Sequence, residues 1–219
     1  MTFDFRKFRW RLASMLFAVA LWTGASAMGT GASAMAASTS VSSSPADIVT
    51  GFHSVLITVM KSAEQLGYAG RFEKLTPHVN STFHMRLMTQ IASGKHWRKA
   101  AEPQKKALVE AFARVSIATY AARFDGFSGQ QFKTLSTKDG PQQTQLVVTR
   151  LLNPGGDDVD LTYVIKQMDG KWRIIDIVLD TGISELAVRR SEYRQVLNRD
   201  GIDGLIAMLN GKAAQLGKS

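Results

Sequence analysis

Cysteine is absent from this chain of 219 residues, and histidine and proline are scarce, with four and five copies. Without cysteine the chain can form no disulfide and offers no thiolate nucleophile or thiolate metal ligand. The histidines have no metal-ligand spacing to one another or to a carboxylate run, and neither a Gly-x-Ser-x-Gly elbow nor a phosphate-binding glycine loop is present. We therefore expect no metal and no cofactor.

Long hydrophobic runs are also missing after the N-terminus. Basic residues between Arg6 and Arg11 precede a short apolar run, Leu12–Trp22, and small-x-small cleavage sites follow, such as Ala25-Ser26-Ala27. This pattern is typical of a secretory signal peptide, and the run is shorter than the roughly 20 residues of a membrane-spanning helix. We predict a signal peptide over residues 1–36 that uses the Sec route, because no Arg pair precedes the apolar run. An uncleaved anchor is the alternative.

The formal net charge is +9, of which the predicted signal peptide contributes +3, so about +6 remains for the exported protein. Basic residues cluster at 95–106 and 189–199. A solvated basic surface explains these clusters, and attraction to anionic headgroups or to an acidic partner is the functional alternative. An exported chain without a nucleic-acid-binding motif is not expected to bind nucleic acid.

The first half of the predicted domain, 45–217, has helical patterns. Residues 37–44 are rich in Ala, Ser and Thr and are predicted to be a disordered linker. Ser44-Pro45 then predicts the start of a helix that ends near Gly67, followed by a looser segment over 68–78. Asn80-Ser81 predicts a cap for a helix to about residue 93, and Glu102-Pro103 begins the longest helix, to about residue 122.

The second half has strand patterns over 131–137, 143–152, 157–167 and 172–179. Asp169-Gly170 is the strongest hairpin signal. After the fourth strand, Asp180-Thr181-Gly182 predicts a turn, and helical periodicity resumes over 183–197 and 202–216 on either side of Gly201. The sequence thus predicts an α+β fold in which a four-stranded antiparallel curled sheet forms a cone, with an N-terminal helical subdomain and C-terminal helices.

Two charged residues lie in apolar surroundings. Asp176 follows Ile175 in the fourth strand, and Arg190 falls on the apolar stripe of the next helix. For Asp176 one interpretation is a buried, hydrogen-bonded carboxylate that meets Arg190 or Lys166, and for Arg190 it is an ion pair with Asp176 or Asp180. The alternatives are a general base for Asp176, which would make an isomerase or hydratase, and a headgroup contact for Arg190 at the mouth of a pocket.

Several segments resemble one family in order and spacing over essentially the whole exported chain. The resemblance is carried by Trp172, Asp180-Thr181-Gly182-Ile183-Ser184, Arg190-Ser191-Glu192-Tyr193, Leu75-Thr76-Pro77 with Phe83, Gly94-Lys95-His96-Trp97, Gln104, Phe112, Tyr120, Val147-Val148-Thr149, Tyr163 and Gly201-Ile202-Asp203-Gly204-Leu205-Ile206. The chain resembles the periplasmic lipid carriers of the MlaC family, also called toluene-tolerance Ttg2D. Gly182–Tyr193 most resembles the hopanoid-associated HpnM branch.

The resemblance implies a fold similar to NTF2-like cones and a non-enzymatic carrier, expected to be monomeric. It implies a periplasmic protein that binds acyl or hopanoid lipid and moves it between an inner-membrane ABC transporter complex and an outer-membrane lipoprotein complex. The predicted lining comprises Phe83, Leu87, Met88, Phe112, Val115, Phe132, Leu146, Val148, Leu161, Tyr163, Ile174 and Ile183. An enzyme with an NTF2-like fold that uses Asp176, and an envelope adaptor with a filled core, remain as alternatives.

Overall fold

The computed structural model describes residues 43–180 and 182–218. The predicted signal peptide and most of the predicted linker lie outside this part of the chain. The elements in chain order are α1 (Pro45–Lys61), α2 (Ala63–Thr82), α3 (Met85–Ser93), α4 (Lys95–Lys99), α5 (Glu102–Arg123), β1 (Gln131–Gly140), the 3₁₀ turn η2 (Pro141–Gln143), β2 (Thr144–Leu152), β3 (Val159–Met168), β4 (Lys171–Leu179) and α6 (Glu185–Leu216).

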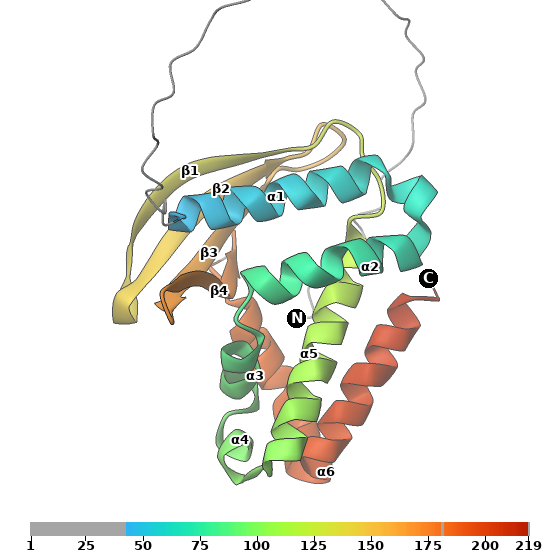
Figure 1. Ribbon diagram of the computed structural model, residues 1–219, viewed down its shortest axis with the longest axis vertical. Coiled ribbons are helices and arrows are strands. Elements are labelled where there is room, and N and C mark those ends of the chain that lie inside the picture. Colours follow the sequence, from blue (N-terminus) through green and yellow to red (C-terminus); the bar gives the residue numbers. More distant parts are fainter. Residues whose placement is uncertain (1–42, 181, 219) are drawn as a thin grey trace, which may run out of the picture. The chain divides into compact units, whose positions relative to one another are not determined.

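The four strands form one antiparallel sheet in the order β1-β2-β3-β4. Asp169 and Gly170 both have positive φ, 51° and 72°, as a two-residue turn of type I′ requires. The register shifts by one residue in β1 between Thr134 and Ser136, and again in the pairing of β3 with β4. Such bulges increase twist and bend a sheet, and Figure 1 shows the sheet curving around α1. The predicted α+β class and curled antiparallel sheet are confirmed.

The sheet has an inner face toward the helices and an outer face. On β2, Val147 and Thr149 are fully buried, and the register places Val147 beside Tyr163 of β3. Leu146 and Val148 alternate with them and point to the outer face, where they are half-buried. The prediction that Leu146 and Val148 share a lining with Tyr163 and Ile174 is therefore wrong.

Helix α1 lies along the inner face (Figure 1). Ser44 caps it: its hydroxyl accepts a bond from the Asp47 amide, and the Asp47 carboxylate accepts one from the Ser44 amide. This arrangement satisfies two of the amides that a helix start leaves unpaired. The apolar stripe of α1 is buried and consists of Val49, Phe52, Leu56, Val59 and Met60. The predicted helix start at Ser44-Pro45 is confirmed.

Two predictions about the next segment are wrong. Residues 68–78 are not loose but belong to α2, in which Gly67 makes a kink at φ 57° and Pro77 lies within the last turns. The cap of α3 is not Asn80-Ser81 but His84, whose Nδ1 accepts a bond from the Leu87 amide. An imidazole acceptor takes the place of the usual hydroxyl or amide side chain, so the usual cap residues did not indicate this helix start.

Helices α5 and α6 lie side by side below the sheet (Figure 1). Helix α5 begins at Glu102, as predicted, and buries Leu108, Phe112 and Val115. Helix α6 begins at Glu185 with Ser184 as its cap, so Ile183 precedes the helix instead of beginning it. Gly201 interrupts α6 at φ 68°, which matches the predicted separation of two helical stretches.

Candidate functional site

Aromatic rings from three helical segments meet between α1 and the sheet. The Phe52 ring centre lies 5.1 Å from that of Phe83 and 5.3 Å from that of Tyr120, both edge to face. Phe83 also forms a bridge to Ile174, and the amide of His84 donates to the Ile174 carbonyl. Edge-to-face pairs of this kind stabilise an apolar interior, and the pairing with Ile174 fixes this interior to β4.

A histidine lies beside this cluster, at the contact of α1 with the sheet. His53 is 4% exposed, its Nε2 lies 2.9 Å from the Tyr163 hydroxyl, and its ring stacks on Phe132 at 3.8 Å. Burial lowers the pKa of His53 from 6.5 to about 3, because desolvation disfavours the imidazolium. Burial also raises the pKa of Tyr163. Both groups are therefore neutral at pH 7, and one hydrogen bond between neutral partners joins α1 to β3.

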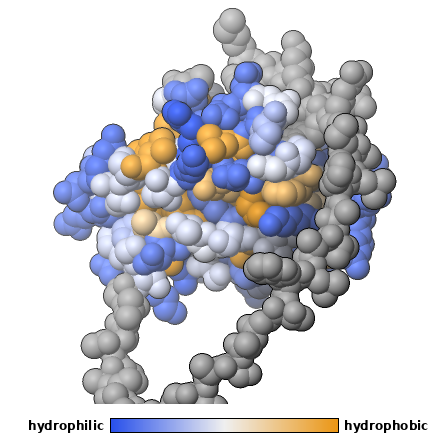
Figure 2. Space-filling view, turned by 90° about the horizontal axis from the view of Figure 1, so that it is seen from above, coloured by the Kyte–Doolittle hydropathy of each residue, from blue (hydrophilic) through white to orange (hydrophobic). Residues whose placement is uncertain are grey.

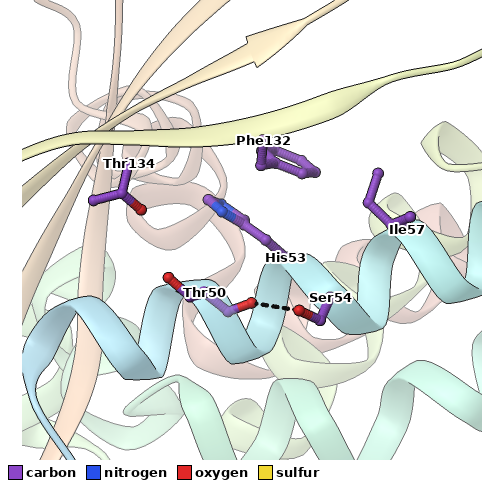
Figure 3. Close-up of a pocket in the computed structure, with 6 residues that line it drawn as sticks. All are labelled: Thr50, His53, Ser54, Ile57, Phe132 and Thr134. Carbon is purple, nitrogen blue, oxygen red and sulfur yellow. Dashed lines mark hydrogen bonds between the residues drawn. The ribbon is translucent and has the colours of Figure 1, made fainter.

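A hollow of about 370 Å³ opens beside His53, between α1 and β1. In Figure 3 the His53 ring points from α1 toward Phe132 and β1, while the Thr50 carbonyl accepts the hydrogen bond of the Ser54 hydroxyl. The lining is Thr50, His53, Ser54, Ile57, Phe132 and Thr134. Hydroxyl groups lie at this opening and aromatic rings behind it, an arrangement that suits an amphipathic molecule better than a polar one.

A second hollow, of about 320 Å³, lies between α2, α3 and α5. It is lined by the mainly apolar set Phe72, Thr76, Asn80, Met85, Val109, Glu110, Ala113, Arg114 and Ile117. On the face shown in Figure 2, hydrophobic residues reach the surface in separate patches with hydrophilic residues between them.

The structure separates the predicted lining into five groups. Phe83, Phe132, Leu161, Tyr163 and Ile174 lie on the inner face of the sheet or against it. Met88 is buried and Leu87 half-buried on α3, while Phe112 and Val115 are buried on α5. Leu146 and Val148 lie on the outer face, and Ile183 is 47% exposed. The lining prediction did not include Phe52, His53 and Tyr120.

Asp176 neither faces the interior nor pairs with Arg190. Its register partner is Val164, on the face of β4 opposite to Ile177, which pairs with Tyr163. Its carboxylate accepts bonds from the amides of Ile177 and Leu186 and from the Ser184 hydroxyl, so it fixes the start of α6 to β4. The interpretation of Asp176 as a hydrogen-bonded carboxylate is confirmed, whereas the predicted ion pair with Arg190 is wrong. Asp176 does not occupy the position that a general base inside the cone would require.

Two adjacent arginines of α6 differ in their surroundings. Arg190 is exposed, and its guanidinium lies over Gly94, whose added Cβ would be 3.5 Å from Nη2. Arg189 is half-buried between α6 and α5.

In the described part of the chain, no three His, Asp or Glu side chains come together as a metal site would require. No helix there is both long and apolar enough to cross a membrane.

The geometry defines an α+β protein with a curled sheet that encloses an aromatic interior under α1. The family model of the MlaC protein matches residues 52–211, and the chain belongs to this family. The fold is also similar to a solved phospholipid-binding protein from Ralstonia solanacearum in complex with a phospholipid. The two chains are 21% identical with a TM-score of 0.68, and the match covers 77% of this chain and 96% of that one.

Proposed function

We propose that this protein is a lipid carrier that binds acyl chains between α1 and the inner face of the sheet. The observation that carries the proposal is the contact at His53. There, a long apolar helix closes over an aromatic interior, is joined to β3 by one hydrogen bond between neutral groups, and borders an open hollow. The family membership and the phospholipid bound to the similar Ralstonia protein support the same ligand class.

The hollow is smaller than the proposed ligand requires. At about 370 Å³ it lies near the lower limit of small-molecule pockets, which span about 300–1,000 Å³. A two-chain lipid therefore needs α1 to move away from β1, with Phe132 and His53 displaced from each other. Each buried CH₂ contributes about 0.8 kcal/mol, so about a dozen of them supply roughly 10 kcal/mol toward the lost contacts of α1 with the sheet.

The wider role that we propose follows the family. The protein would act in the periplasm, without a catalytic step, and would exchange lipid with an inner-membrane ABC transporter complex and an outer-membrane lipoprotein complex. The resemblance of Gly182–Tyr193 to the hopanoid-associated branch supports a hopanoid as the ligand, in place of a phospholipid or in addition to it.

Native mass spectrometry of the protein purified from its own source tests the proposal. We expect a stoichiometric adduct whose mass, after organic extraction, identifies a phospholipid or a hopanoid. A protein that is empty and also takes up no lipid from vesicles would overturn the carrier function.

The movement of α1 has its own test, which the absence of native cysteine makes clean. Ser54→Cys and Thr134→Cys place thiols on α1 and β1 at the same hollow, where a short bis-maleimide can join them. We expect the joined protein to take up no lipid, whereas each single variant capped with a mono-maleimide loads as the unmodified protein does. Full loading of the joined protein would show that lipid enters by another route.

A further inference from the structure

The contact of α5 with α6 carries polar side chains that the proposed acyl site does not use. The Phe112 and Tyr193 ring centres are 6.5 Å apart, and one helical turn away Arg189 faces Ser116. On the next turn, Tyr120 of α5 has a pKa that is raised chiefly by burial, and Glu185 of α6 is one of the charges that also act on it. The two helices therefore run in opposite directions, and a row of polar groups leads from Tyr193 to Tyr120.

Arg189 is an incompletely paired cation in this row. Its guanidinium carbon lies 5.2 Å from the centre of the Phe112 ring, and its Nη1 donates a long bond of 3.5 Å to the Ser116 hydroxyl. Burial raises the pKa of the Tyr193 phenol, and the nearby Arg189 partly offsets this rise. The ion pairs found among residues 43–180 and 182–218 join Arg86 and Lys105 to Glu102, Arg150 to Asp160, and Arg199 to Asp200, and none includes Arg189.

A guanidinium has five N–H donors, so these contacts leave part of its capacity unused. A half-buried charge without a counter-ion is costly, because desolvation is not offset by an ion pair. Arg123 and Glu185 also act on Tyr120, but their charges are opposite and can balance each other. Since none of the ion pairs above includes Arg189, its guanidinium is available to an anion from outside the chain.

Tyr120 connects this row to the aromatic interior. Its ring contacts Phe52 at 5.3 Å and Phe83 at 5.9 Å, inside the proposed acyl site. Its side chain is only partly buried overall. Tyr120 therefore lies where the apolar interior ends and the row of polar groups begins.

We propose that Arg189, with the hydroxyl of Tyr120, binds the phosphate group of a phospholipid whose acyl chains occupy the interior. The planar fork of a guanidinium matches two phosphate oxygens, and the aromatic surroundings strengthen such a bond relative to water. The inference rests on the proposed function, since it assigns the headgroup end of the same lipid. It also selects Arg189 over Arg190, the residue to which the sequence pattern pointed.

The test measures loading from vesicles by native mass spectrometry, with the folded protein and three arginine variants. Vesicles contain either a phospholipid or a diacylglycerol with the same acyl chains, so only the phosphate-bearing headgroup differs. Arg189→Gln removes the proposed contact, Arg190→Gln tests the rival, and Arg194→Gln is a control with the same loss of charge on the exposed side of α6. If Arg189→Gln does not fold, Arg189→Lys serves, because lysine keeps the charge and loses the fork.

We expect Arg189→Gln to lower phospholipid loading about tenfold or more and to leave diacylglycerol loading unchanged, since a bond between charged groups is lost. Arg190→Gln and Arg194→Gln should load both lipids normally. The inference is overturned if Arg189→Gln loads phospholipid normally, if both lipids decline together, or if Arg190→Gln is the variant that loses phospholipid.

A titration with inorganic phosphate separates this inference from the carrier function. Side-chain NMR of ¹⁵N-arginine-labelled protein should show one arginine signal that shifts on titration and is absent in Arg189→Gln. If the protein loads neither lipid but this signal still shifts, the anion site stands and the carrier function fails. If neither lipid nor phosphate binds, both fail. Lipid loading that is independent of Arg189 sustains the carrier function alone.

Discussion

Two helix contacts in this protein differ in what they enclose. Apart from the polar row at Arg189, α5 and α6 also carry an aliphatic part of the core, in which Leu108, Leu205 and Leu209 are at most 1% exposed. Between α1 and the sheet, the core includes the His53–Tyr163 hydrogen bond and borders an open hollow. Close packing makes separation of the first contact expensive. The second contact is the one that can open for a ligand while the rest of the fold persists.

Truncation of a leucine in the aliphatic core at α5 and α6 should have the largest effect on stability. We expect Leu209→Ala to lower the free energy of unfolding by about 3 kcal/mol, since it leaves a cavity in a fully buried site. Urea titration followed by circular dichroism measures it. The half-buried neighbour Met208→Ala is the control and should cost less than half as much. Equal costs would mean that the site of Leu209 is not closely packed.

Acid should act mainly on the contact of α1 with the sheet. Since the pKa of His53 is about 3 in the folded protein and 6.5 unfolded, the unfolded chain binds the additional proton between these values. The stability that the folded state gains from keeping His53 neutral is therefore fully present above pH 6.5 and is lost as the pH falls toward 3. From pH 7 to pH 5 we expect a loss of about 2 kcal/mol. His53→Gln should remove this loss, whereas the exposed His78→Gln should retain it.

Truncation of a side chain at the edge of the hollow should cost less stability and should also change the rate of lipid uptake. Phe132 is half-buried, so Phe132→Ala should lower the free energy of unfolding by only about 1–2 kcal/mol. Because the lost contacts hold α1 closed, lipid uptake from fluorescent vesicles should become faster, up to about tenfold. Leu135→Ala, on the same strand but 50% exposed, should change neither quantity. Slower uptake by Phe132→Ala would contradict the opening at this contact.

Substitutions on the outer face of the sheet should change the free energy of unfolding least. Arg150 and Asp160 form a two-bond ion pair across β2 and β3, and it holds the pKa of Asp160 below its usual value. Both side chains are partly solvated, so Asp160→Asn should cost less than about 1 kcal/mol. Thermal unfolding at low and high salt measures it. A larger loss would show that the outer face is not the solvent-exposed side that the register indicates.

The sequence predicted the sheet better than the site. Asp169-Gly170 can adopt two positive φ angles, so the last hairpin was predictable from local chemistry alone. The face of β2 was not, because Leu146, Val147 and Val148 are all apolar and the fully buried neighbour is the polar Thr149. Periodicity gives a face only when apolar and polar residues alternate.

The other differences between the predictions and the structure depend on residues that are distant in the chain. His53 is a buried core histidine whose hydrogen-bond partner, Tyr163, lies 110 residues away in the chain. Nothing local separates Arg189 from Arg190, since adjacent helical residues differ by 100° in direction and only the position of α5 selects one. Helix α2 was missed for a similar reason, because Gly67 and Pro77 are poor helix formers that tertiary packing overrides.

The separation between His53 and Tyr163 also has a kinetic consequence. The hairpins of the sheet close over short loops, whereas α1 can dock only after β3, which follows it by more than a hundred residues in the chain. Loop-closure entropy therefore places the docking of α1 late in folding. The amides of β1 facing α1 should accordingly gain protection from hydrogen exchange after those of β3. Entry of a lipid would then reverse only the final step of folding, the docking of α1, while the sheet stays folded.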